Sequence, residues 1–364
     1  MLVDTDIQFC FQRHIAIIHP CIITNHYLYV VLGSAYIKSF CDAKATGVAQ
    51  RTVSLTTLRD MLIPIAPLSE QANIFAQAEM LLQIIEEITF DQKDLLETIA
   101  ITKTRILNLA IRGRLVPQDP EDEPASVLLE RIHAEKEELI KQGKIKRDKK
   151  ESFIFRGDDN SYYRSNNKKT ELCEDLPFDV PNGWTWVSLG QYCERVTDQV
   201  ASGSFASLRE NVVSLKEPSY ALMVKTADFS NGFTKNLTYT DKRGYEFLEN
   251  SNLFGGELIL SNIGSIGKVF IVPEMNCKMT LAPNSVMIRF VNDEHRDYVY
   301  NFLMSPLGYE QLTSITSGAA MLKFNKTDLK TIYVPIPPLA EQKRIVQAIE
   351  TTFVQIDEIT NVIL

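Results

Sequence analysis

A duplicated segment constrains the fold of this chain more than any other feature of its sequence. Residues 27–88 align with residues 298–359 without a gap, at the constant offset of 271 positions that separates Tyr27 from Tyr298. One register held over so long a stretch indicates a duplicated module, and the period is too long for a solenoid repeat. Identical residues occupy the pairs Tyr27/Tyr298, Tyr29/Tyr300, Leu32/Leu303, Gly47/Gly318, Thr56/Thr327, Leu58/Leu329, Pro64/Pro335, Ile65/Ile336, Pro67/Pro338, Leu68/Leu339, Glu70/Glu341, Gln71/Gln342 and Ile74/Ile345.

Each copy of the repeat predicts the same order of elements. A helix carries the tyrosines, a loop carries the glycine, and a short strand runs into prolines that precede a long helix. Pro67 and Pro338 end the strand and favour a helix start. Glu70 and Glu341 then fall in the first helical turn, where the helix dipole favours an acidic side chain. We therefore expect two equivalent modules, each with a globular part followed by a helix.

The stretch 15–32 is apolar, but His19, Pro20, Asn25 and His26 interrupt it. It therefore lacks the continuous apolar run of a signal peptide or of a membrane-spanning helix. We expect a buried strand followed by a short helix in this stretch.

A seven-residue apolar period follows the last proline of each copy, which predicts coiled-coil helices. The first helix is expected to run from Ser69 to about Arg112 and to end at Gly113. The two helices are expected to pair antiparallel, and a generic two-helix core element is the alternative. The seams are Ile74, Leu81, Ile88, Leu95, Thr102 and Leu109 with Ala78, Ile85, Gln92, Ile99 and Ile106 in the first helix, and Ile345, Thr352 and Ile359 with Ile349, Ile356 and Ile363 in the second.

Composition limits the chemistry that the chain can carry. A hydrophobic content of 45% with 23% charged residues is typical of a globular protein. The net charge of −8 argues against DNA binding, although a local basic face is compatible with it. The six cysteines form no CxxC pair and the five histidines have no ligand spacing, so we expect reduced thiols and no metal site. The sequence has no NPPY-type methyltransferase motif, nucleotide loop or nuclease motif, so no catalytic residue is predicted.

The region after the first long helix has the composition of a connector. Prolines and acidic residues in 117–124 predict a turn, and Ser126 is expected to cap a second helix that runs to about Gln142. Residues 146–175 are polar and begin with a basic run, which is typical of a linker.

Five strings resemble conserved segments of the specificity subunits of Type I restriction–modification systems. RGRLVPQDPEDEPASVLLERIHAEKEELIKQGKIKRDK resembles their central conserved region, and DLPFDVPNGWTWVSLGQ resembles the entry to their second target-recognition domain. GELILSNIGSIGKVFIV resembles a strand–glycine loop–strand unit inside such a domain. PIAPLSEQANIFAQAE and PIPPLAEQKRIVQAIE resemble the exits into the conserved helices. The order of the strings is that of the family, and together they cover nearly the whole chain.

The resemblance implies an α+β fold, with α/β target-recognition domains separated by long antiparallel coiled-coil helices. It also implies a division of the chain into five parts. Residues 1–66 would be the C-terminal part of a first target-recognition domain, 67–145 the first conserved helical spacer region, 146–175 a linker, 176–337 the second target-recognition domain, and 338–364 the start of the second conserved helix.

The resemblance further implies a non-catalytic, cytoplasmic subunit that directs adenine methylation and restriction to a DNA sequence. Its partners would be double-stranded DNA, methyltransferase subunits along the conserved helices and restriction/translocase subunits, with no membrane. S-adenosylmethionine, ATP and Mg would be bound by the partner subunits, with no cofactor on this chain.

The repeat offset also predicts that the chain is cut at both ends. Met1 corresponds to Val272, so the first domain is expected to lack the counterpart of about residues 176–271. Two alternatives follow from this expectation. The chain would be a DNA-inactive helical scaffold, or a single-domain half-subunit that dimerises to read a symmetric site.

Glycine loops with polar neighbours are the candidate DNA contacts, because they let a backbone approach the duplex and supply hydrogen-bonding groups. A purely structural turn explains each loop equally well. SNIGSIGK is not a phosphate-binding P-loop, since Asn262 and Val269 stand where that motif needs Gly and Ser or Thr. The candidates are Asn262, Ser265 and Lys268 in SNIGSIGK, Lys323 and Asn325 in the Gly318 loop, Gln50 and Arg51 in its first-copy counterpart, and Lys242 and Arg243 in a predicted polar loop.

Overall fold

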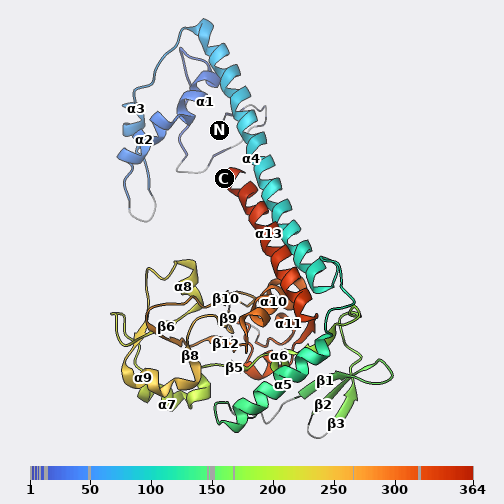
Figure 1. Ribbon diagram of the computed structural model, residues 1–364. Coiled ribbons are helices and arrows are strands. Elements are labelled where there is room, and N and C mark those ends of the chain that lie inside the picture. Colours follow the sequence, from blue (N-terminus) through green and yellow to red (C-terminus); the bar gives the residue numbers. More distant parts are fainter. Residues whose placement is uncertain are drawn as a thin grey trace. The chain divides into compact units, whose positions relative to one another are not determined.

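The chain folds into two compact units, residues 1–97 and 98–364, in a computed structural model (Figure 1). Helix α4 (Leu68–Ile111) contributes to both units. The part of the chain that the structure describes contains no helix with the length and apolarity needed to cross a bilayer. The structure describes residues 2, 3, 5, 7, 10, 11, 15–47, 51–145, 147, 152–166, 169–264, 266–318 and 321–363.

The first unit is helical and has a small core. It contains α1 (Asn25–Gly33), α2 (Ala35–Lys44), α3 (Leu55–Arg59) and the first part of α4. Side-chain oxygens of the residues before the first three helices accept backbone N–H groups of the first helical turn, which is why the helices begin where they do. Tyr27, Val31 and Ile37 form the buried core of the unit.

Two strands expected in the first unit are wrong. Residues 15–24 contain no strand, and the chain only becomes regular at α1. Residues 61–67 are extended but unpaired. A strand needs a neighbour to bond its N–H and C=O groups, and within the described residues neither segment has a strand beside it.

The second unit is an α+β body built from four sheets. These are the sheets β10-β9-β12-β5, β7-β6-β11-β8 and β1-β2-β3 and the two-stranded pair β13-β4 (Figure 1). In chain order its further elements are α5 (Ala125–Lys141), β1 (Ser152–Arg156), β2 (Tyr162–Asn166), β3 (Lys169–Leu172), β4 (Thr185–Ser188), α6 (Leu189–Tyr192), β5 (Arg195–Thr197), η1 (Gln199–Ser202), α7 (Phe205–Asn211), β6 (Ala221–Val224), α8 (Thr226–Ser230), β7 (Tyr239–Thr240), α9 (Lys242–Phe247), η2 (Glu249–Ser251), β8 (Asn252–Leu253), β9 (Leu258–Ser261), β10 (Val269–Ile271), β11 (Lys278–Leu281), β12 (Ser285–Arg289), α10 (Asp293–Met304), α11 (Pro306–Ser314), α12 (Lys326–Leu329), β13 (Tyr333–Ile336) and α13 (Leu339–Ile363).

The central sheet of the second unit is covered on both faces. In β9, Leu258 and Leu260 point into the larger core with the helices, and Ile259 points into the smaller core with β6, β8 and β11. Successive strand residues face opposite sides of a sheet. Both sets are therefore apolar, and the strand reads as a continuous hydrophobic run instead of an alternating one.

The strand before the second proline pair is fully integrated into the larger core. β13 pairs antiparallel with β4, so that Val334 lies opposite Val187 and Pro335 lies opposite Trp186. The Trp184 indole donates to Glu341 Oε2 at 2.9 Å, and the Trp186 indole donates to the Phe178 carbonyl at 3.1 Å. The tryptophan entry thus fixes both the strand and the start of α13.

The expectation of a linker over 146–175 is wrong where this region forms β1, β2 and β3. Ile154 of β1 is buried, and its backbone N–H donates to Gln191 Oε1 at 2.9 Å. Aromatic residues of β1 and β2, such as Phe155 and Tyr163, stack across the strands. Aromatic residues favour strands, and the polar composition had concealed them.

The connector helix begins two residues before the position expected. α5 starts at Ala125, and Pro124 stands at its N-cap without a side-chain cap bond, so the prediction of a Ser126 cap is wrong. The expected helix end at Gln142 is confirmed as the C-cap. Gly113 follows α4 with φ of +65°, the left-handed conformation that ends a helix.

Candidate nucleic-acid interface

The first glycine loop connects two strands of the central sheet. β9 and β10 form an antiparallel hairpin, as expected from the string GELILSNIGSIGKVFIV. Gly264 and Gly267 have φ of +80° and +86°, values that favour glycine. A Cβ on Gly267 would lie 2.6 Å from the ring of Tyr309, whereas one on Gly264 would meet open space. Gly267 therefore has a packing role, and Gly264 leaves the loop backbone open to approach.

The second glycine loop lies against the first one. Gly264 N–H donates to the Leu322 carbonyl at 3.1 Å, and Phe324 N–H donates to the Asn262 carbonyl at 3.1 Å. Lys323 forms backbone bridges with both Ile263 and Ser317. Two candidate loops that are distant in sequence thus lie side by side, and we call their described residues the loop surface (262–264, 266–268, 317, 318 and 321–325).

The loop surface carries two lysines with open side chains. Lys268 and Lys323 are exposed, and neither has an ion-pair partner within the described part of the chain. Lys326, which follows the surface, instead binds Asp198 Oδ1 at 2.8 Å. Phosphate contacts require cations that are free to reach the backbone of DNA. Lys268 and Lys323 meet this requirement, and Lys326 does not.

Aromatic and apolar groups lie beside these lysines. The ring of Tyr309, which is 53% exposed, covers Gly267, and Met321 and Leu322 are exposed at the tip of the second loop. Base edges and sugars offer both hydrogen-bonding and apolar groups, so this mixture suits contact with a groove. Tyr309 was missed in the sequence because nothing in its spacing connects α11 with the Gly267 loop.

The two asparagines among the candidates serve mainly the fold. Asn325 Oδ1 accepts the N–H groups of Thr327 and Asp328 at 2.8 and 3.0 Å, which caps α12. Asn262 Nδ2 donates to the Phe324 carbonyl at 3.3 Å and joins the two loops. Buried Asn262 Oδ1 has no hydrogen-bond partner among the described residues. Ser265 lies outside the described residues.

The first copy of the repeat presents a different loop. Gly47 has φ of +104°, close to the +108° of Gly318. Arg51 stands where the second copy has Leu322, and its guanidinium donates to the Asp42 carbonyl at 2.5 Å. Gln50, the other candidate of this loop, lies outside the described residues. The shared backbone therefore carries different side chains in the two copies.

Lys242 and Arg243 begin helix α9, so the expected polar loop is wrong at these positions. Asp241 caps this helix by accepting the Gly244 N–H at 2.7 Å. Arg243 donates to Asn211 Oδ1 at 2.7 Å, and Lys242 lies 3.7 Å from Glu246. α9 contacts α7 and β7, elements on the side of the second sheet. The loop surface thus does not include these residues.

Lys278 lies next to α9 and was not singled out in the sequence. Its Nζ donates to the Tyr220 hydroxyl at 2.7 Å and lies 5.4 Å from the centre of the Tyr245 ring. The hydrogen bond to Tyr220 raises the pKa of Lys278 above its usual value. This second basic cluster is already engaged in pairs within the chain, whereas Lys268 and Lys323 are not.

Known proteins resemble this chain in the region that contains the loop surface. Residues 208–364 match the family model described as Type I restriction modification DNA specificity domain. The Type I restriction enzyme EcoAI specificity subunit of Escherichia coli is 31% identical over 252 residues, which cover 66% of this chain and 37% of that protein. The EcoEI specificity subunit of the same organism is 27% identical over 270 residues, which cover 71% of this chain and 41% of that protein.

The chain thus spans less than half the length of these relatives. A solved structure that concerns complex assembly and conformational transition of the type I R-M system matches 94% of this chain and 66% of its own, with a TM-score of 0.53 and 17% identity. This likeness shows a shared fold. Residues 208–364 thus belong to the Type I restriction modification DNA specificity domain family, and the chain is similar to the specificity subunits of Type I restriction enzymes.

Proposed function

We propose that the chain is a sequence-specific DNA-binding subunit without an active site of its own. In the cytoplasm it directs adenine methylation and restriction by partner subunits, which hold S-adenosylmethionine, ATP and Mg. The observation that carries the DNA-binding role is the loop surface. Its two adjoining loops carry two exposed lysines without ion-pair partners among the described residues and an open glycine backbone, and an exposed tyrosine packs on it, within the matched specificity domain.

The loop surface resolves the conflict with the acidic net charge. Counterion release depends on local cations that approach phosphates, not on the sum over the chain. Lys268 and Lys323 supply these cations, while many acidic residues lie on helices such as α4 and α5. We place the phosphate contacts on the lysines and the contacts with the groove on Tyr309 and the loop tips.

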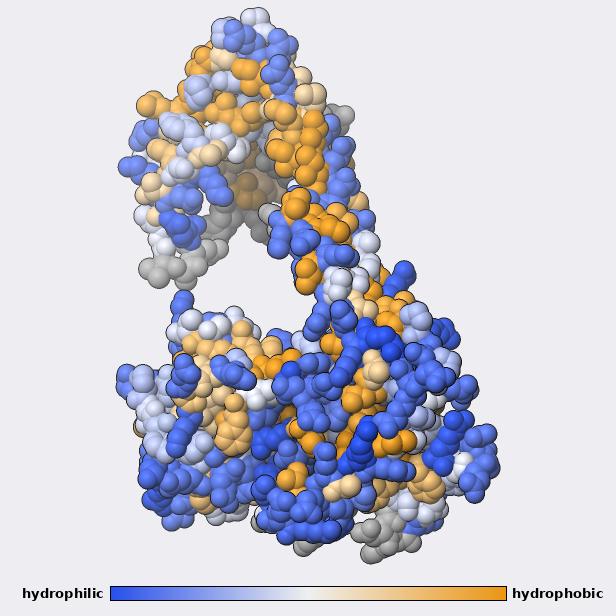
Figure 2. All heavy atoms as spheres, in the orientation of Figure 1, coloured by the Kyte–Doolittle hydropathy of each residue, from blue (hydrophilic) through white to orange (hydrophobic). Residues whose placement is uncertain are grey.

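The long helices are the surfaces for protein partners in this proposal. Several apolar residues of α4 in the first unit are exposed, and Figure 2 shows them as hydrophobic patches along the helix. A helix stripe of this kind is covered by protein in a stable assembly. We propose that methyltransferase subunits and antiparallel pairing with the second conserved helix cover it. The exposed residues are Met80, Leu81, Leu82, Ile84, Ile85, Ile88, Phe90 and Leu95.

Within the second unit, α4 already contacts α13. Lys103 forms an ion pair with Asp357, and its ammonium lies 5.2 Å from the centre of the Phe353 ring. Ile345 and Ile349 of α13 are buried in the larger core. These contacts support the antiparallel pairing that we propose for the longer helices.

The DNA-binding role is tested by the salt dependence of duplex binding. Lys268→Ala and Lys323→Ala should each lower affinity for all sequences and reduce the slope of log affinity against log salt by about 0.9. The double variant should reduce the slope by about 1.8, because the two lysines contact different phosphates. Fluorescence anisotropy with a labelled non-specific duplex measures these slopes without knowledge of the target sequence.

Lys93→Ala is the matched control, since Lys93 is an exposed lysine on α4 outside the loop surface. Its slope should equal that of the unmodified chain. If Lys268→Ala and Lys323→Ala also left affinity and slope unchanged, the loop surface would not contact DNA and the proposal would fail.

A further inference from the structure

The two copies of the repeat differ in what covers their proline segments. In the second copy, Val334 and Ile336 of β13 are fully buried. In the first copy the equivalent residues are Ile63, which is only half-buried, and Ile65, which is 63% exposed. The residues are apolar in both copies, so the difference lies in the covering element and not in the sequence of the segment.

The covering element of the second copy is the strand–helix unit β4–α6. β4 pairs with β13 along its whole length, and α6 follows it directly. Val187 and Leu189 are fully buried against this segment, as is Tyr192. Tyr192 donates its hydroxyl proton to Gln342 Oε1 at 2.8 Å. Within the described residues the first copy has no equivalent of this unit.

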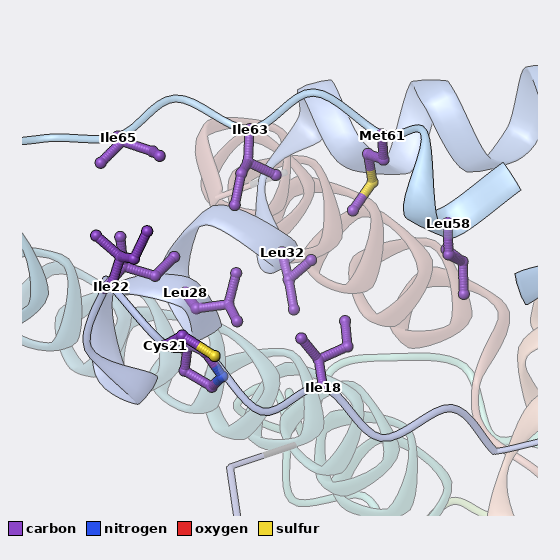
Figure 3. Close-up of a pocket in the computed structure, with 11 residues that line it drawn as sticks. Ile18, Cys21, Ile22, Leu28, Leu32, Leu58, Met61, Ile63 and Ile65 are labelled. Atoms are coloured by element: carbon purple, nitrogen blue, oxygen red, sulfur yellow. The ribbon is translucent and has the colours of Figure 1, made fainter. Parts of the chain in front are cut away.

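The first copy instead presents an apolar groove of about 280 Å³ (Figure 3). Figure 3 shows Leu28, Leu32 and Ile63 pointing into the same space. The counterparts of these three residues, Val299, Leu303 and Val334, are fully buried in the second copy. The remaining lining residues include Ile18, Ile22, Leu58, Met61 and Ile65.

The backbone beside the groove is also open. Within the described part of the chain, the N–H groups of Leu62, Ile63 and Ile65 donate to no backbone carbonyl. The carbonyls of Leu62 and Pro64 accept tyrosine hydroxyls, but the N–H groups stay free, and an extended segment with free N–H groups and apolar neighbours is a template for an added strand. The groove therefore offers both ladder bonds and a hydrophobic floor to an incoming strand.

The glutamine after the prolines is held alike in the two copies. Gln71 is buried and donates to the Ala66 carbonyl at 2.9 Å, as Gln342 donates to the Pro337 carbonyl at 2.9 Å. The Gln71 Oε1 accepts the backbone N–H of Thr24 at 2.8 Å, the place that the Tyr192 hydroxyl has in the second copy. A tyrosine hydroxyl can bind there by sharing or replacing the bond from Thr24.

We propose that this groove binds a strand followed by a helical turn, supplied by a second polypeptide whose sequence resembles residues 180–195 of this chain. The strand pairs antiparallel with residues 62–65, and its apolar side chains fill the groove. A second copy of this chain is not the source. Its own Trp186, Val187 and Leu189 are fully buried, and releasing them would unfold the domain around them. This inference does not depend on DNA binding.

The test uses the full 364-residue chain and a labelled synthetic peptide with the sequence of residues 180–195, carrying Cys193→Ser to prevent disulfide formation. Fluorescence anisotropy should show saturable binding. Hydrogen exchange should slow at Ile63 and Ile65 when peptide is bound, because their N–H groups, like those of Val334 and Ile336 in β13, then face the added strand. A peptide with Tyr192→Phe should bind about threefold to tenfold more weakly, through loss of one hydrogen bond.

Ile65→Asp should weaken peptide binding at least about tenfold, because docking would bury a carboxylate. The side chain is exposed in the free chain, so the variant should fold normally. Ile88→Asp is the matched control. Ile88 is 52% exposed and its counterpart Ile359 is 53% exposed, so the strand–helix unit does not cover this position.

Two results would overturn the proposal. One is the absence of binding at about 1 mM peptide. The binding free energy would then be weaker than about −4 kcal/mol, which is too weak for a docking site. The other is slow exchange at Ile63 and Ile65 in the chain without peptide, because the groove would then already be filled by this chain or by a second copy.

Discussion

Residues 27–88 and 298–359 share a sequence register but are embedded differently. Their internal contacts agree closely. The Tyr27 hydroxyl donates to the Pro64 carbonyl at 3.0 Å, and the Tyr298 hydroxyl donates to the Pro335 carbonyl at 2.7 Å. Around the prolines the copies diverge, since residues 333–336 form a buried strand and residues 62–65 are unpaired and largely exposed.

The difference separates features that form from contacts within one copy from features that need a partner outside it. Helix caps, the glycine turn and the tyrosine–proline bond need only residues of the copy itself, so both copies form them. The strand needs a neighbour for its ladder bonds and a layer above its apolar side chains. β4 and the tryptophans supply these to the second copy alone, so the same pattern gives a strand in one context and an unpaired segment in the other.

The largest expected difference is in the free energy of unfolding when the equivalent residues Ile336 and Ile65 are replaced by alanine. Ile336→Ala should destabilise the second unit by about 2–5 kcal/mol, because it leaves a cavity in a close-packed core. Ile65→Ala should change stability by less than about 0.5 kcal/mol, because the side chain is largely exposed. Urea unfolding followed by tryptophan fluorescence reports the second unit, which contains both tryptophans, and hydrogen exchange in α1 reports the first.

Equal losses for the two isoleucine variants would show that residues 62–65 are packed as tightly as β13. The comparison between the two copies would then be wrong. Ile359→Ala serves as an internal control in the second copy, since this side chain is exposed on α13 and should behave like Ile65.

A smaller contrast is expected for the equivalent tyrosines. Tyr298→Phe should lower the free energy of unfolding by about 1–3 kcal/mol, because it leaves the buried Pro335 carbonyl without its donor. Tyr27→Phe should cost about 0.5 kcal/mol, because water can reach the exposed Pro64 carbonyl. Urea unfolding with the same two probes measures both variants. A larger loss for Tyr27→Phe than for Tyr298→Phe would contradict the assigned burial.

Local signals in the sequence predicted much of the fold correctly. The helices that carry the tyrosines, the helix starts after Pro67 and Pro338 and the end of α4 at Gly113 are confirmed. Their signals are caps, prolines and glycines, which act within a few residues. Two predictions were wrong: the linker predicted where β1, β2 and β3 form, and the strand predicted at 61–67. Both failed because strand formation depends on partners that are distant in sequence.

The candidate site was only partly predictable for the same reason. Each glycine loop was recognisable from its glycines and polar neighbours. Their contact through Lys323 depends on how β9 and the segment before α12 meet in the folded domain. The position of Tyr309 over Gly267 depends on the packing of α11 in the same way. Which residues contact DNA stays a prediction, with Lys268 and Lys323 favoured for phosphate contacts by their exposed side chains.

The smallest effect concerns the glutamates of the two helix starts. Burial raises the pKa of Glu341 above its usual value, and the hydrogen bond from Trp184 and the positive charge of Arg344 only partly oppose this. The protonated form is therefore favoured in the folded state. Stability from this group is fully present below the unfolded pKa and is lost as pH rises through the folded pKa. Glu341→Gln should flatten the decline in the unfolding free energy of the second unit above pH of about 4.3.

Urea unfolding at a series of pH values, followed by tryptophan fluorescence, measures this slope. Glu70→Gln is the matched control, since Glu70 is the exposed equivalent in the first unit and should leave the profile of the second unit unchanged. A Glu341→Gln profile as steep as that of the unmodified chain would assign the decline to other carboxylates. The hydrogen bond from Trp184 to Glu341 would then have no effect on folding. It would therefore not explain why the helix start of the second copy differs from that of the first.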